Sequence, residues 1–276
     1  MKSSTTDLSH RLIHIIPFGI LLCANSSIAA QSPEWQLGAG LGAFNFRLYP
    51  GASNSNTYVL PLPYFTYSSK LLEIDRGIRA LMPSDSNWQL DLSADFGLPV
   101  NSTDSEARRG MPNLDAIVQI GPSLEYTFNA NKTDAQQLRI EFPLRTAISV
   151  DIEQQANQGW IFEPRLVYEK NRIGRAGLFV NAKIGVRYAT QDYHAYYYDV
   201  APAYTTLQRA TFNSESGYSG LVMDLRGTWR KNNVLYWGLL RYQNLNHTVI
   251  EHSPLVEDKN YFFFSIGISW ILATSL

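Results

Sequence analysis

A long run of two-residue alternation between residues 114 and 151 constrains the fold of this chain more than any other feature. Within residues 116–128 and again within 138–150, apolar or aromatic residues recur at almost every second position, and the positions between them are mostly polar or small. The turn-forming segment Asn129–Asp134 separates the two runs. This pattern predicts a β-hairpin with one apolar face and one polar face.

The length of these two runs points to a membrane. Each exceeds the ~5–6 residues typical of strands in globular sheets. Strands of ~10 residues with apolar and charged faces fit a barrel in lipid, apolar outside and polar in the lumen. No stretch after residue 30 approaches the ~20 apolar residues that a transmembrane helix needs. A membrane protein without such helices must be a barrel, because its backbone polar groups need partners in lipid.

The alternation recurs along the rest of the chain. Two prolines interrupt residues 57–67, where we expect an irregular or bulged strand, and residues 191–216 form the longest connection. The expected strands number eleven, but a barrel whose two chain ends lie on the same side of the membrane needs an even number of strands. We therefore expect an all-β, antiparallel, up-and-down transmembrane barrel of about 12 strands, with 10 as the alternative. A missed strand lies in residues 57–82 or 193–211. The further expected strands are residues 35–46, 57–67, 71–82, 88–98, 160–169, 176–188, 218–230, 234–248 and 261–272.

The first 30 residues are expected to be a cleaved signal peptide, followed by a barrel domain over residues 31–276. A basic start is followed by the mostly apolar run Leu12–Ala24 and by a plausible cleavage site at Ser27–Ala30. An N-terminal anchor helix is the alternative, but the run is shorter than the ~20 residues of a span. Cleavage would remove Cys23, the sole cysteine, and with it any disulfide or cysteine-based metal site.

Charge and aromatic content narrow the function classes. The chain has 23 basic and 24 acidic residues, a balance that argues against binding to nucleic acid. Aromatic residues make up 13% of the chain. Several lie near expected strand ends, where amphipathic rings meet the membrane–water interface; sugar-stacking platforms are the alternative. The expected girdle residues are Trp35, Trp88, Trp160, Tyr188, Trp229, Tyr236 and Trp270.

Full charges recur on the polar faces of the expected strands. Opposite signs on neighbouring strands can form cross-strand pairs. A barrel of about twelve strands lies in size between small packed barrels and wide porins, so such pairs would leave a narrow or occluded lumen. The expected lumen charge network comprises Asp91, Asp95, Glu125, Arg139, Glu141, Arg145, Glu163, Arg165, Lys183 and Arg187.

Two short motifs carry a resemblance to a known family. They are Tyr49-Pro50-Gly51 and Pro61-Leu62-Pro63, and weaker matches are Arg76-Gly77 and Ser253–Val256. In these segments the chain resembles the MipA/OmpV family of outer-membrane proteins. The resemblance implies a barrel in outer-membrane lipid, reached by secretion to the periplasm. It also implies a scaffold that links a lytic transglycosylase to a murein synthase, and it supplies no catalytic residue.

Three functions are weighed. The first is a monomeric, non-enzymatic scaffold without cofactor or metal, and the second is a narrow diffusion channel for small solutes. The third is a lipid acyl hydrolase, which would need His247 to meet a serine and a carboxylate. His194 and His252 are further histidines, with Ser219, Ser253 and Glu251 as possible partners. We expect these to be polar residues at the barrel rim, and we expect no catalytic site.

Overall fold

The computed structural model describes residues 34–69, 72–74, 78–80, 87–128, 136–150, 155–173 and 177–275. The expected signal peptide, residues 1–30, lies outside these ranges. The described chain forms one antiparallel sheet and three short helices. The strands are β1 (Glu34–Arg47), β2 (Ser55–Ser68), β3 (Leu72–Ile74), β4 (Ile78–Ala80), β5 (Trp88–Gly97), β6 (Ala116–Thr127), β7 (Gln136–Val150), β8 (Gln155–Phe162), β9 (Arg165–Ile173), β10 (Leu178–Ala189), β11 (Gly217–Lys231), β12 (Val234–Asn244) and β13 (Asn260–Thr274). The helices are η1 (Ser102–Asp104), α1 (Gln191–Tyr198) and η2 (Pro202–Tyr204).

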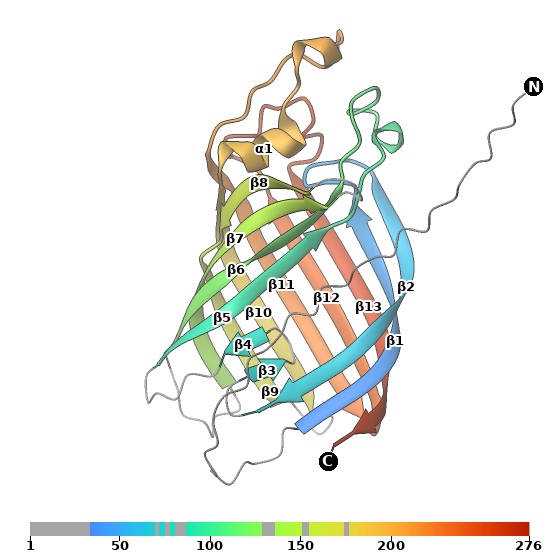
Figure 1. Ribbon diagram of the computed structural model, residues 1–276, viewed down its shortest axis with the longest axis vertical. Coiled ribbons are helices and arrows are strands. Elements are labelled where there is room, and N and C mark those ends of the chain that lie inside the picture. Colours follow the sequence, from blue (N-terminus) through green and yellow to red (C-terminus); the bar gives the residue numbers. More distant parts are fainter. Residues whose placement is uncertain are drawn as a thin grey trace, which may run out of the picture. The chain divides into compact units, whose positions relative to one another are not determined.

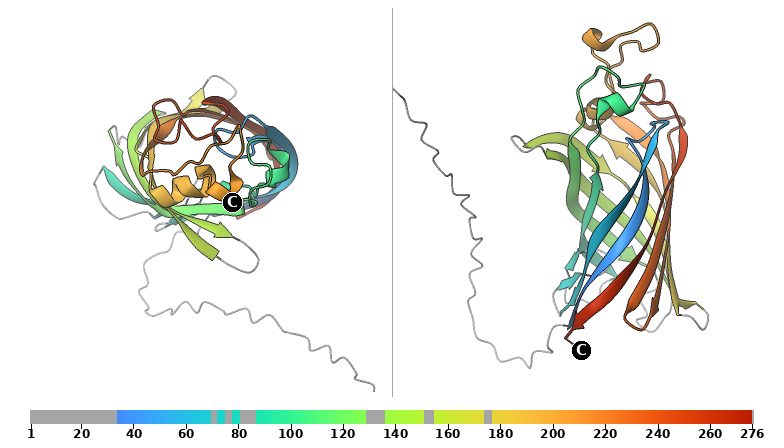
Figure 2. Two further views of the ribbon diagram at one scale, coloured as in Figure 1. Left: turned by 90° about the horizontal axis from the view of Figure 1, so that it is seen from above. Right: turned by 90° about the vertical axis from the view of Figure 1, so that its right-hand side faces the viewer.

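Hydrogen-bonded pairing leads from strand to strand around a circuit (Figures 1 and 2). β1 pairs with β2 on one side and with β13 on the other, and β10 pairs with β11. The remaining pairs join neighbours in the chain, except that β9 also pairs with β7 and β10 also pairs with β8, and all are antiparallel. The expected all-β, antiparallel, up-and-down architecture is confirmed.

In the part of the chain that the structure describes, the strand passages number twelve, as expected, although thirteen strands are separate along the sequence. β7 pairs with β8 through residues 144–150 and with β9 through residues 136–141. β8 and β9 are therefore two halves of one passage, which breaks at Glu163 and Pro164 because proline cannot donate to a ladder. The strand passage that the sequence count missed lies where the apolar–polar alternation was weakest. The expected strand at residues 71–82 is instead the short pair β3 and β4.

Pro61 and Pro63 do not disturb β2, so the expected irregularity there is wrong. The register between β1 and β2 runs without a shift from Ser68 to Ser55. The two prolines are two residues apart, and both therefore lack an N–H on the same edge of the strand. Because the pairing with β1 is intact, that edge is the one facing away from β1.

The two faces of the strands reverse the arrangement of a water-soluble protein. Leu124 and Leu144 are 44% and 43% exposed, whereas their neighbours Glu125 and Arg145 are 5% and 1% exposed. Apolar side chains thus cover the outside and charges line the inside, which is the arrangement expected when lipid is the outer solvent. Gly38, whose Cβ would lie 2.1 Å from the carbonyl oxygen of Trp270, is buried on the inner face as well.

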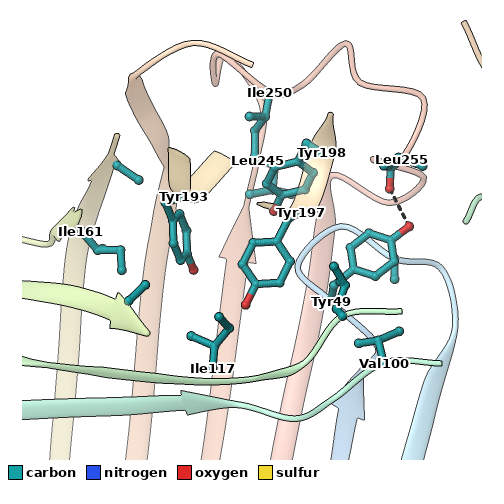
Figure 3. Packing of buried hydrophobic residues seen from close by; sticks show 14 of the residues in the cluster. Tyr49, Val100, Ile117, Ile161, Tyr193, Tyr197, Tyr198, Leu245, Ile250 and Leu255 are labelled. Carbon is teal, nitrogen blue, oxygen red and sulfur yellow. Dashed lines mark hydrogen bonds between the residues drawn. The ribbon is translucent and has the colours of Figure 1, made fainter. Parts of the chain in front are cut away.

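The apolar core lies at one end of the barrel, beneath α1 (Figure 3). Residues 191–216 are a connection, as expected from the sequence, but their first part is helical. Tyr193 and Tyr197 lie four residues apart, so they share one face of α1, and both are buried. Tertiary burial therefore stabilises a helix that is only two turns long. Among the described residues, no helix has the length and apolar character to cross a membrane.

Candidate functional site

Buried ion pairs on β6, β7 and β9 form the first half of the candidate site. Arg139 contacts Glu125 at 3.3 Å, Glu141 at 2.9 Å and Glu169 at 2.9 Å. Glu141 in turn accepts from Arg165 at 2.5 Å. Period-two alternation places each of these side chains on the inner face, and the antiparallel register brings the opposite signs together.

Glu163 is the centre of the second half. It lies in the break between β8 and β9 and contacts Arg187 at 2.6 Å, Arg145 at 3.2 Å and Arg165 at 3.2 Å. Its side chain is 4% exposed, and that of Arg145 is 1% exposed. Charges this deeply buried are tolerated only when they are paired and hydrogen-bonded. Glu163 and its three arginines are thus mutually dependent.

One contact joins strands that are not neighbours. Arg241 on β12 lies 2.7 Å from Asp224 on the adjacent β11 and 3.3 Å from Asp95 on β5. β5 and β12 do not pair with each other, so the Arg241–Asp95 contact crosses the lumen. Charges therefore span the interior in addition to lining it.

The structure places all ten residues of the expected charge network on the inner side. Eight of them, on β6 to β10, join in the two clusters above, with Lys183 lying 3.4 Å from Glu141. Asp95 joins through Arg241, and Asp91 lines an interior cavity together with the charged residues of these clusters. Arg241 and Asp224 are absent from the expected set although both lie on expected strands; their opposite signs in register across β11 and β12 are the signal that could have identified them.

The described residues enclose cavities inside the barrel, two of which adjoin the ion pairs or the strand ends. One of about 430 Å³ is lined by the ion pairs and by the aromatic residues Phe44, Phe46 and Phe263. The other, of about 740 Å³, lies toward the chain ends and is lined by Trp35 and Trp237, among others. Phe44 and Arg226 line both cavities, so the two adjoin.

The loops at the α1 end bind one another into a cap. The Tyr49 hydroxyl donates to the carbonyl of Leu255 at 2.9 Å (Figure 3), and Tyr198 donates to the carbonyl of Pro50 at 2.9 Å. The Arg108 guanidinium lies over the Tyr49 ring, 5.6 Å from its centre. Burial raises the pKa of Tyr49 to about 12, so its hydroxyl remains a donor. Four separate loops therefore meet at Tyr49 and its neighbours.

A histidine lies at the base of this cap. His194 is fully buried; its Nδ1 lies 2.6 Å from the carbonyl oxygen of Glu215 and its Nε2 lies 2.9 Å from the Ser219 hydroxyl. The carbonyl requires a proton on Nδ1, so Nε2 of the neutral ring accepts from Ser219. His247 contacts Glu251 through its backbone N–H. The serine–histidine–carboxylate arrangement that a hydrolase would need at His247 is not formed by these residues.

Acidification should loosen the cap. Burial lowers the pKa of His194 below its ordinary value of 6.5, so folding favours the neutral ring. The stabilisation is complete above the unfolded pKa of ~6.5 and is lost as the pH falls toward the folded pKa. Hydrogen exchange of the α1 amides, corrected for intrinsic rates, should accelerate between pH 7 and pH 5. His194→Gln should remove most of this dependence; an unchanged pH response in that variant would contradict the assignment.

A match to a family model identifies the family of this chain. A family model described as MltA-interacting protein MipA matches residues 37–272. The chain belongs to the MipA family. This confirms the resemblance, and membership together with the barrel topology indicates an outer-membrane β-barrel protein.

Other comparisons add context for this MipA-family protein. No curated protein matches it. One similar solved structure is the outer-membrane protein OprG from Pseudomonas aeruginosa, at 12% identity, with 88% of this chain and 94% of that chain covered and a TM-score of 0.25. Another is a bacterial polysaccharide outer membrane secretin, at 8% identity, with 89% and 100% covered and a TM-score of 0.30.

The girdle residues expected from the sequence lie toward the two ends of the strands of this MipA-family barrel. Trp160 and Tyr188 lie toward the α1 end, and the other five lie toward the opposite end, where β1 begins and β13 ends. There the rings of Trp229 and Tyr236 stack with centres 5.1 Å apart. Six of the seven are among the exposed large apolar residues, all but Trp229. A role as interfacial anchors remains a prediction.

Proposed function

We propose that this protein is a non-enzymatic scaffold of the outer membrane that binds murein-processing enzymes at its periplasmic end. The observation that carries the proposal is the match of residues 37–272 to a family described by its interaction with MltA. A barrel of this kind has short periplasmic turns and longer outer loops. The end with the chain termini is then periplasmic, and the end with α1 faces outward.

The interior supports a scaffold better than a wide pore. Ion pairs span the lumen through Arg241, and the packed loops cover the outer end (Figure 2). The two cavities favour a second candidate, which is slow passage of small solutes. A rearrangement of the ion pairs would be needed for that passage.

Retention of a lytic transglycosylase by the intact barrel tests the scaffold. The full-length protein in detergent should retain a soluble form of such an enzyme above the level of an unrelated barrel. Lys231→Glu in the periplasmic turn between β11 and β12 should weaken retention, because it reverses an exposed charge at the proposed interface. The matched control is Arg109→Glu in an outer loop, where the side chain is 66% exposed. Retention equal to that of the unrelated barrel would reject the scaffold.

A further inference from the structure

Two tyrosine hydroxyls of α1 are directed into the smaller cavity, whose volume is about 430 Å³. Tyr193 and Tyr197 both line it, and Figure 3 shows their hydroxyl groups pointing away from the cap loops and toward the barrel interior. The Tyr193 hydroxyl accepts from the Gln119 side chain at 3.3 Å and donates to no described residue. The Tyr197 hydroxyl has no hydrogen-bond partner among the described residues, although this tyrosine is only 6% exposed. The helix therefore presents two available donors to the cavity.

Polar atoms without partners gather around the same cavity. Among the described residues, six buried side-chain nitrogen or oxygen atoms lack a hydrogen-bond partner. Four of the six belong to residues that line this cavity, namely Gln119 Oε1, Ser123 Oγ, Arg145 Nε and Asn181 Oδ1. Native proteins leave few buried polar atoms unpaired, so a concentration of them at one place calls for an explanation. It indicates a polar site whose hydrogen bonds are completed by a bound molecule.

The charges around the cavity balance one another. Eight basic and six acidic residues line it. Glu163 pairs with Arg145 and Arg187 from just outside the lining, and Asp258 pairs in the same way with Arg47. With these two partners the acidic groups also number eight. A charged ligand would add an uncompensated charge to this buried network, so the cavity favours a neutral one.

Three phenylalanine rings give part of the cavity an apolar wall. Phe44 and Phe46 on β1 and Phe263 on β13 are half-buried and line it. The centre of the Phe46 ring lies 4.7 Å from that of Phe263 and 5.7 Å from that of Phe44, so the rings form one continuous surface. The face of an aromatic ring carries partial negative charge, which attracts polarised C–H groups. Apolar walls with a few placed polar groups are typical of small-molecule sites.

We propose that the smaller cavity binds a neutral sugar of one or two rings. A sugar has C–H groups on its ring faces and hydroxyl oxygens around its rim, and it therefore suits both kinds of wall. Its C–H groups lie against the three phenylalanine rings, and its oxygens accept from Tyr193 and Tyr197. The volume lies within the ~300–1,000 Å³ of small-molecule sites. This binding is independent of the proposed scaffold role, so that either can fail without the other.

Saturation-transfer NMR on the full-length protein tests the proposal, in a detergent without a sugar headgroup. The probes are glucose, galactose, N-acetylglucosamine and maltose, each titrated separately. At least one of them should give a saturable signal that an excess of the same sugar removes. The absence of saturable binding by all four would overturn the proposal. Glucuronate and galacturonate, which carry a charge on the same ring, should bind several-fold more weakly than glucose and galactose; equal binding would refute the preference for a neutral ligand.

A pair of tyrosine variants tests the position of the site. Tyr197→Phe removes a hydroxyl that no described residue binds, so it should weaken sugar binding several-fold and leave the thermal unfolding midpoint unchanged. The matched control is Tyr196→Phe, one residue earlier on α1, whose hydroxyl donates to the carbonyl of Asp115 at 3.0 Å. This variant should bind sugar as tightly as the wild-type protein. Unchanged affinity in the Tyr197 variant would place the sugar elsewhere and refute the site.

A second pair tests the apolar wall. Phe263→Ala should weaken sugar binding several-fold, because it removes one of the three rings from the cavity. Phe264→Ala changes the adjacent residue, which is 50% exposed on the outer face, and should leave the affinity unchanged. Equal affinities in the two variants would refute the contact with the rings. The wild-type titration and the Tyr197 variant decide the site even where the Phe263 variant fails to fold.

Discussion

Glu163→Gln is expected to destabilise this barrel more than any other single change of charge. The substitution leaves Arg145, Arg165 and Arg187 beside a neutral amide. Removing one member of a buried ion pair costs about 3–5 kcal/mol, because the remaining charge is left without compensation in a poorly solvating interior. The free energy of unfolding, measured by urea titration of the refolded protein in lipid vesicles, should fall by that amount.

An exposed pair provides the control for this measurement. Glu106→Gln removes the partner of Arg109 in an outer loop, where the two side chains are 78% and 66% exposed. Pairs of this kind contribute about 0–1 kcal/mol, because water solvates both charges. Equal losses in the two variants would show that the Glu163 cluster is hydrated to the same extent as the loop, and would contradict its burial from water.

Removing the contact that crosses the lumen is expected to increase ion conductance several-fold. The double substitution Asp95→Ser with Arg241→Ser removes one charge of each sign and replaces both side chains with shorter ones, and it leaves Asp224 without Arg241. Wild-type protein in planar bilayers at neutral pH should show no large stable current steps, because charged side chains occupy the path. The double variant should show steps more often and of greater size.

The control for conductance alters a charge pair away from the lumen. Glu106→Ser with Arg109→Ser removes an exposed pair of the same signs, and its currents should equal those of the wild-type protein. Large stable steps from the wild-type protein itself would exclude an occluded lumen. They would favour the second candidate function, passage of small solutes, over a scaffold with a filled interior.

The sequence alone was sufficient to predict most of the strands and the direction of their faces. Side chains alternate with period two in any strand, so Leu124 and Glu125 must point to opposite sides whatever the rest of the chain does. The length of the alternating runs then indicated that the apolar face contacts lipid. The short separation of Arg139 and Glu141 on one strand placed them in one cluster. These properties depend on local geometry and on neighbours in the chain.

Other features became visible only in the tertiary structure. The Arg241–Asp95 contact joins residues 146 positions apart on strands that do not pair, because the curvature of the whole sheet decides which residues face each other across the lumen. The helix α1 forms because the other loops bury its tyrosines, although its own sequence is a weak helix former. Likewise, Pro61 and Pro63 suggested a defect within β2, whereas the intact pairing with β1 shows that their nitrogen atoms face away from that strand. Period-two alternation specifies the face of each side chain, but the closing of the sheet and the packing of its loops specify what that side chain meets.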